Sequence, residues 1–512
     1  MSSVIPSLYM SRRFLPVALL SLFAPLASLP AQTAETIPPP PTPVRNPEFT
    51  LREAVARALE KNFTLQVQNF STETAALAID IAEADYSPEL GLTARTGVTQ
   101  AAAAGSTLDG VTQEGPRQDY TNISASVTQK VTTGASVTGS TNLDRSETNS
   151  RNTLLNPAYD SDVSLQVSQP LLRGFGPDYN KAAIARARLG VERANYDFKG
   201  TVLDVVRDVE VAYYNLVFAR EQLDVRRFSL SVAEQLLEEN KARKDTGVAT
   251  DLDVLQAQVG VANANRALIE AQRVAQDRED ALLDLISQFE FSSGVGTVGV
   301  PDLVIPDVSF DHSYKLARDN WPAYASQLAA IEQLDIDVRT ARSNRLPSLD
   351  LGGAVGYNAK EADADAATRN VWDGEGYSWQ VNLSLRVPWG FKEEKARLGT
   401  ARASLAREET RLRQIEQTVM VQVRAAVRSV EANEESVRIS TLATELSERQ
   451  FELEKARFDA GLSTFRRVQE SQEDLDAARV NELQARVNLR IALAQLARLE
   501  ASSLPRYSIV LE

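Results

Sequence analysis

The chain of 512 residues contains no cysteine and only one histidine, His312. The absence of cysteine excludes disulfide bonds, thiolate zinc sites, cysteine nucleophiles and an acylated lipoprotein N-terminus. A single histidine cannot build a multi-histidine metal site, and a Ser-His-Asp triad would depend on His312 alone. Because Ser309 or Asp311 makes a good helix N-cap, we expect His312 at the start of a surface helix. The sequence therefore predicts no enzyme activity, no cofactor and no metal site.

Basic residues are also scarce relative to acidic ones. The chain has 55 Lys and Arg against 69 Asp and Glu, which gives a net charge of −14. A surface that binds nucleic acid must neutralise phosphates with concentrated basic side chains, so we expect no nucleic-acid partner. With 43% hydrophobic and 24% charged residues, the composition is typical of a folded chain.

Long apolar runs are absent after the first thirty residues. Arg12 and Arg13 precede the apolar stretch 14–29, and the small residue Ala31 follows it. This pattern predicts a cleaved signal peptide at 1–31, followed by an extended Pro-rich linker at 32–48. An uncleaved N-terminal anchor is the alternative. Because no later run is long enough for a transmembrane helix, any membrane insertion would have to use β-strands.

Four segments alternate apolar and polar residues as strands do. The sequence predicts strands at about 89–99, 161–170, 348–358 and 377–388. In the last of them the apolar positions are separated by polar ones, so we expect the apolar set to face lipid; its members are Val381, Leu383, Leu385 and Val387. Alternation alone suits equally a soluble half-buried sheet and a barrel with lipid outside and water inside.

Most of the remaining chain has helical periodicity with few breaks. Helices are expected at about 176–246, 250–288, 391–460 and 464–499, the longest on the order of 100 Å in length. The first and the last of these helices each carry two apolar stripes rather than one seam. In the last helix Val487 lies on one stripe and Leu489 on the other. Two stripes indicate neighbours on two sides, as in a wall of several helices.

The chain contains an internal duplication. A short segment from Leu51 to Asn62 aligns with one from Phe310 to Asn320, and the order strand, strand, long helix, return helix follows in both. We define a first repeat at 49–290, a second repeat at 308–500 and a C-terminal tail at 501–512. The first repeat has about forty extra residues between its two strands, which contain a hairpin at about 119–145. This insert is either an external hairpin, which its Ser- and Thr-rich composition favours, or a pair of additional wall strands.

This order of elements, from about Leu51 to Leu499, resembles the TolC-type outer-membrane efflux proteins. The segments 247–250 (Gly-Val-Ala-Thr) and 461–464 (Gly-Leu-Ser-Thr) look like that family's two helix-turn-helix tips. The resemblance implies a mainly α fold with a transmembrane β-barrel: a homotrimer whose chains share one barrel in the lipid of the outer membrane, above a long periplasmic α-helical barrel. It also implies a periplasmic adaptor (membrane fusion) protein and an inner-membrane transporter as partners.

The two tips carry the candidate functional residues. A glycine at each turn suits positive φ, and an apolar neighbour at each tip suits a docking surface. The expected adaptor-docking residues are Gly247, Val248, Thr250, Gly461, Leu462 and Thr464. The resemblance further places a periplasmic gate at Asp251, Asp253, Arg467 and Glu470, with Arg467 replacing one of the family's acidic residues. Arg467 would pair with Asp253 or Glu470, or these charges would form a solvated helix face; the tips themselves would dock a partner or merely link helices.

No phosphate-binding loop of the type Gly-x-x-x-x-Gly-Lys-Ser/Thr occurs in the sequence, so any pump energy must come from a partner. The predicted function is a passive outer-membrane exit duct of a tripartite efflux or type I secretion system. The alternative is a non-conducting structural or adhesive coiled-coil protein of the envelope.

Overall fold

The computed structural model describes residues 49–102, 104–105, 112–113, 115–150, 153–247, 249–289, 294–299 and 308–510. The expected signal peptide at 1–31 and the linker at 32–48 lie outside the described residues, and so does Val248. Within the described ranges, no helix is both long and apolar enough to cross a membrane.

The first repeat begins with two helices, continues with strands and ends with two long helices. Its helices are α1 (Leu51–Lys61), α2 (Phe63–Ala84), α3 (Pro177–Asn180), α4 (Ala182–Asp245) and α5 (Asp251–Ile286). Its strands are β1 (Glu89–Gln100), the short pair β2 (Ala104–Gly105) and β3 (Thr112–Gln113), β4 (Arg117–Lys130), β5 (Ser136–Thr148) and β6 (Ala158–Pro170).

The second repeat has the same order with two strands. Its elements are α6 (Phe310–Asn320), α7 (Pro322–Ser343), β7 (Ser348–Glu361), α8 (Ala364–Asn370), β8 (Gly376–Arg386), α9 (Lys392–Asp459) and α10 (Phe465–Glu500). His312 is exposed in the first turn of α6, where Ser309 is the N-cap residue. The tail contains α11 (Ser503–Arg506), whose Leu504 packs into the core.

The long helices form two antiparallel pairs. α4 packs on α5 and α9 on α10, while α4 also contacts α10 and so joins the two pairs. Nearer the sheet, neighbours follow the order α2, α4, α7, α9. One core cluster is centred on Tyr213 of α4, and a second is centred on Val423 of α9 and Leu489 of α10. In α4 and α10 the two apolar stripes thus contact neighbours on two sides.

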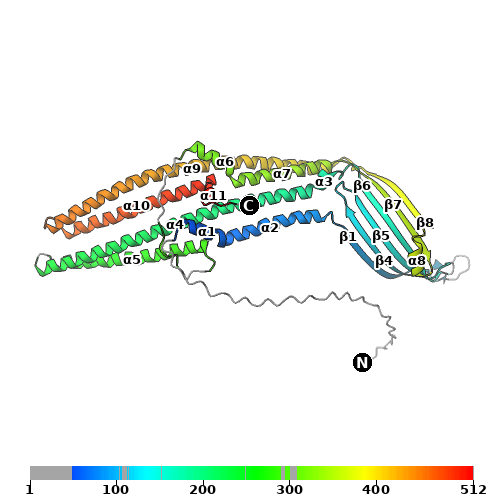
Figure 1. Ribbon diagram of the computed structural model, residues 1–512, viewed down its shortest axis with the longest axis horizontal. Coiled ribbons are helices and arrows are strands. Elements are labelled where there is room, and N and C mark those ends of the chain that lie inside the picture. The colour runs from blue at the N-terminus through cyan, green and yellow to red at the C-terminus, as the bar shows by residue number, and fades with distance from the viewer. Residues whose placement is uncertain are drawn as a thin grey trace, which may run out of the picture. The chain divides into compact units, whose positions relative to one another are not determined.

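The six long strands form one antiparallel sheet in the order β1-β4-β5-β6-β7-β8 (Figure 1). The inserted hairpin, β4 and β5, therefore lies inside the sheet between β1 and β6, so the external hairpin that its composition favoured is wrong. The hairpin fits there because its apolar residues lie on the same face as those of the neighbouring strands: Leu92 lies opposite Ala125, and Leu90 opposite Val127. Most of the Ser and Thr residues of the hairpin then lie on the opposite, polar face.

Candidate functional site

One face of the sheet carries large apolar side chains on all six strands; it becomes charged at the end of β4 and β5 that holds Asp119, Arg145 and Glu147. In β8, Leu383 is 63% exposed and lies opposite Leu351, and Leu385 lies opposite Leu349. The pairing register places apolar side chains on this same face in every strand from β8 to β1. Its large apolar side chains are Leu90, Leu92, Val98, Ile123, Val127, Val137, Leu143, Val163, Leu165, Val167, Leu349, Leu351, Val355, Tyr357, Trp379, Val381, Leu383 and Leu385. Val387, also expected to face lipid, is exposed just beyond the end of β8.

The opposite face of the sheet is hydrophilic. Asn142 Nδ2 donates to Asp144 Oδ2 at 2.6 Å and to Asp162 Oδ1 at 3.3 Å. Lys360 Nζ lies 3.0 Å from Asp160 Oδ2 on the neighbouring strand. A sheet with one apolar and one charged face is suited to lipid on one side and water on the other.

The sheet has two open edges. β1 pairs only with β4, and β8 pairs only with β7, within the described ranges. At 11 residues β8 is long enough to cross a hydrocarbon core when tilted. In lipid, unpaired backbone N–H and C=O groups at these edges would each be costly, so both edges require another strand.

The first tip lies between α4 and α5. Gly247 has φ of +77°, which lets the chain turn back after α4. Thr250 then caps α5: Asp253 Oδ2 accepts from the backbone N of Thr250 at 2.8 Å and from its Oγ1 at 2.6 Å. These hydrogen bonds from Thr250 lower the pKa of the Asp253 carboxyl. Asp251 Oδ1 lies 2.5 Å from Lys244 Nζ across the turn.

The second tip lies between α9 and α10. Gly461 has φ of +74°, and the side chain of Leu462 is 72% exposed. Thr464 is the N-cap residue of α10 but makes no side-chain capping bond. The sequence thus predicted correctly that both turns need a glycine in the left-handed region.

The structure changes the expected charge pairing at the second tip. Glu470 Oε1 accepts from Arg466 Nε at 2.9 Å, one helical turn away on α10. Arg467 is exposed, and its side chain has no ion pair or hydrogen bond within the described part of the chain. A pairing of Arg467 with Asp253 or Glu470 inside one chain is therefore wrong. Glu470 pairs with Arg466, four positions earlier, although Arg467, three positions earlier, is also a neighbour on the helix surface.

Sequence reasoning missed a buried polar contact between the two helix pairs. Asp476 of α10 is 6% exposed and accepts hydrogen bonds from Ser229 of α4 and, at 2.8 Å, from Gln472 Nε2. Burial raises the pKa of the Asp476 carboxyl. Nearer the tips, the guanidinium of Arg243 in α4 lies 3.8 Å from the ring centroid of Phe458 in α9. The available signal was the pair of polar residues, 472 and 476, that interrupts the buried stripe of α10.

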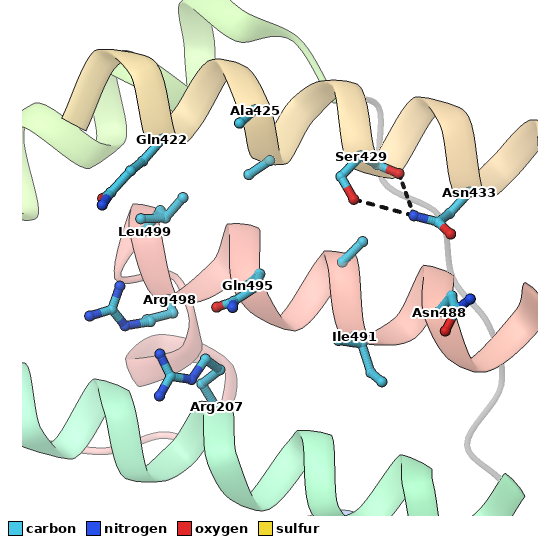
Figure 2. Close-up of a pocket in the computed structure, with 12 residues that line it drawn as sticks. Arg207, Gln422, Ala425, Ser429, Asn433, Asn488, Ile491, Gln495, Arg498 and Leu499 are labelled. Carbon is cyan, nitrogen blue, oxygen red and sulfur yellow. Dashed lines mark hydrogen bonds between the residues drawn. The ribbon is translucent and has the colours of Figure 1, made fainter. Parts of the chain in front are cut away.

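Farther from the tips, α4, α9 and α10 line a cavity of about 630 Å³ (Figure 2). Its lining is mostly alanine and amide side chains. Asn433 Nδ2 donates to the backbone oxygen of Ser429 at 2.6 Å and to its Oγ at 3.3 Å, so these polar groups bond within their own helix. Arg498 is bonded to Asp204.

A duplicated chain that joins a two-faced, open-edged sheet to paired long helices is a subunit of a channel of the outer-membrane type. The CmeC outer membrane channel of Campylobacter jejuni has this fold: it aligns over 90% of each chain with a TM-score of 0.66 and 18% sequence identity. The outer membrane efflux protein family model matches residues 134–288 and 313–501, well over half of the sequence. The chain therefore belongs to the outer membrane efflux protein family.

Two sequence relatives are consistent with this membership. The chain is 25% identical to the outer membrane efflux protein BepC of Brucella suis biovar 1 over 380 residues, which cover 70% of this chain and 74% of that protein. It is 27% identical to the pyoverdine export outer membrane protein OpmQ of Pseudomonas aeruginosa over 349 residues, 67% of this chain and 69% of that protein.

Family membership confirms the predicted fold class and the predicted function. The protein is an outer-membrane exit duct of efflux and secretion systems, and it is not an enzyme. Members of the family work as trimers in tripartite systems with an adaptor and an inner-membrane pump.

Proposed function

We propose that three copies of this chain form one duct, in which the sheets close a barrel in the outer membrane and the helices enclose a tunnel through the periplasm. The two open edges of the sheet carry this proposal, because only strands from other copies pair them without leaving an edge in lipid. The signal peptide at 1–31 would be cleaved on export, and Val381, Leu383, Leu385 and Val387 would face lipid.

Exposed apolar stripes on three helices support the assembly. Two of them lie on α2 and α9, the first and last helices in the order α2, α4, α7, α9 near the sheet. The third lies on α5, whose extensive helix contacts within the described residues are with α4 and α1. The stripes are Phe63, Val67, Phe70, Leu77 and Ile81 on α2; Leu252, Leu255, Val259 and Ile269 on α5; and Ile439, Leu442, Leu446 and Leu453 on α9. We assign a second copy of the same chain as the occupant of these surfaces, since the open sheet edges lie above the same end helices.

The tips would dock the periplasmic adaptor protein, which links the duct to an inner-membrane transporter. Exposed Leu462, held at the turn by Gly461, offers the apolar contact, and Gly247, Val248, Thr250 and Thr464 complete the proposed surface. Asp251, Asp253, Arg467 and Glu470 would form the gate, because a threefold axis would repeat each charge three times around a narrow mouth. Arg467 is the residue best placed to reach a neighbouring copy, since its side chain is exposed and has no partner in its own chain within the described ranges.

Reconstitution tests this proposal against a non-conducting envelope protein. The purified chain should have the mass of three copies in detergent and should form ion-conducting channels in a planar bilayer. A stable trimer that never conducts would favour the structural alternative. A monomer under conditions that preserve its helices would overturn the shared barrel.

A further inference from the structure

The two repeats contribute unequally to the sheet. The second repeat supplies β7 and β8, whereas the first supplies β1, β4, β5 and β6 because of the inserted hairpin. The two-stranded insert does not change the relative direction of β1 and β6. Each is antiparallel to the hairpin strand beside it, and the two are antiparallel to one another. A chain without the hairpin would therefore still allow β1 to pair with β6, as a sheet of four strands.

The helices that adjoin the sheet also form a ring in the proposed trimer. Four long helices per chain lead into or out of the sheet: α2 into β1, α4 out of β6 after the short α3, α7 into β7 and α9 out of β8. α2, α4, α7 and α9 are neighbours in that order. Three copies make a ring of twelve helices, and at about 8–10 Å between axes its circumference is roughly 100–120 Å.

The insert widens the ring that the strands of three copies can form. Strands about 4.8 Å apart and tilted by about 40° each occupy roughly 6 Å of circumference. Twelve strands would give roughly 75 Å, much less than the helix ring, whereas eighteen give roughly 110 Å. A steeper tilt widens either ring, so the strand number follows from the six-stranded sheet of each chain and not from the width alone.

We propose that the trimer closes an eighteen-stranded barrel, six strands per chain, with β8 of one copy paired to β1 of the next. This inference rests on the proposed trimeric duct, and it specifies the number of strands in the barrel and the width of its bore. The barrel would be roughly 36 Å across between backbones, against roughly 24 Å for twelve strands. Its inner wall is the hydrophilic face that carries Asn142, Asp144 and Asp162. The outer-membrane section would thus pass wider hydrated cargo than a barrel of twelve strands.

The continuous faces of the sheet favour this assembly over one in which the hairpin leaves the wall. Val137 of β5 lies opposite Val167 of β6, and Ala94 of β1 lies opposite Ile123 of β4, all on the apolar face. On the polar face, Asn122 Nδ2 donates to Asp144 Oδ1 at 2.8 Å across β4 and β5. Removing the hairpin from the wall would break the backbone ladder on both of its sides.

An electron-microscopy map of the purified trimer tests the strand number directly. Eighteen strands around the threefold axis are expected. A trimer with twelve strands and a separate hairpin would overturn this inference while leaving the exit duct intact. A chain that forms no trimer would overturn both.

Cysteine cross-linking provides an independent measurement, because the chain has no cysteine of its own. Val137→Cys with Val167→Cys should form a disulfide within each chain of the membrane-embedded trimer. Leu92→Cys with Leu165→Cys, on β1 and β6, should not, because two strands separate them. The reverse result would show β1 beside β6 and would overturn the eighteen-stranded barrel.

Polymer exclusion tests the bore. Replacement of residues 101–158 by Asn-Gly, a favoured two-residue hairpin turn that would join Gln100 and Tyr159 of the same face, should give a twelve-stranded duct whose barrel cross-section is about 2.3-fold smaller. Poly(ethylene glycol) of intermediate size, added on the outer side, should enter the parent channel and be excluded from this variant. Equal size limits for two conducting trimers would overturn the inference. If the variant does not assemble, the cross-links in the full chain decide.

Discussion

The hydroxyl of Tyr507, just after α11, donates a hydrogen bond to Oε1 of Glu210 in the middle of α4. Glu210 is only 1% exposed, and its Oε2 has no hydrogen-bond partner within the described residues. Arg506 Nη1 lies 3.8 Å from the same carboxylate. The C-terminal tail thus carries the polar groups that make a carboxylate tolerable inside the α4 core.

Replacing Tyr507 by Phe should destabilise the protein by about 1–3 kcal/mol, because a buried carboxylate would lose its donor. The free energy of unfolding in detergent measures this. Tyr196→Phe is the matched control, since the Tyr196 hydroxyl bonds to Glu192 at an exposed site in the same helix. Equal effects of the two changes would mean that the tail contact contributes nothing specific.

The same carboxyl predicts a pH dependence. Burial raises the pKa of Glu210 above its ordinary value of 4.5, against smaller opposing effects from Tyr507 and Arg506. The folded state therefore favours the protonated form, so this contribution to stability is full below pH 4.5 and is lost as pH rises through the higher pKa of the folded protein.

Glu210→Gln isolates this contribution because the amide does not titrate. Subtracting the unfolding free energy of the variant from that of the parent cancels other buried acids, such as Asp476. The difference should fall as the pH is raised above 4.5. A difference that is flat or rises with pH would contradict the assigned direction.

A charge on the apolar face of β8 should impair assembly. Leu383→Arg should cost about 2–4 kcal/mol near the bilayer midplane, because the guanidinium would face lipid. Asn382→Arg is the matched control, since Asn382 is one residue away on the polar face, opposite Gly352. The amount of trimer in the outer-membrane fraction reports the result. If both variants assemble equally, the lipid-facing assignment is wrong.

The docking surface can be tested at its most exposed apolar residue. Leu462→Asp should reduce chemical cross-linking to the periplasmic adaptor at least tenfold, which corresponds to a loss of about 1.4 kcal/mol in binding, and should leave the trimer intact. Leu154→Asp is the control, because Leu154 is also fully exposed but lies in the loop between β5 and β6. Unchanged cross-linking of the Leu462 variant would leave the tips as simple connections.

The gate charges are tested by conductance. Arg467→Ser should raise single-channel conductance, because it removes a charge that has no partner among the described residues of its own chain and would be able to bind a neighbouring copy. Arg466→Ser should have less effect, since Arg466 is paired with Glu470 on its own helix. Asp253→Ser should also raise conductance by loosening the cap of α5, with no further increase in the double variant with Arg467→Ser. Conductance that is unchanged in every variant would place the constriction elsewhere.

Several features could be predicted from the sequence because they depend on local periodicity and backbone conformation. The alternation around Leu383 predicts a two-faced strand. The glycines at 247 and 461 predict turns with positive φ, which the structure confirms. The duplication predicted the fold class, since each copy preserves the order of its elements even where the spacing differs.

Other features were decided only by the tertiary structure, because they depend on which side chains meet across elements. The composition of the insert favoured an external hairpin, but backbone pairing with β1 and β6 places it in the sheet. Both Arg466 and Arg467 lie within reach of Glu470 along the helix, and only the structure shows that Arg466 is the partner. Glu210 and Tyr507 are 297 residues apart, and Ser229 and Asp476 are 247 apart. Contacts at such separations arise only when the two repeats pack together, because no local pattern encodes the partner of a buried polar group.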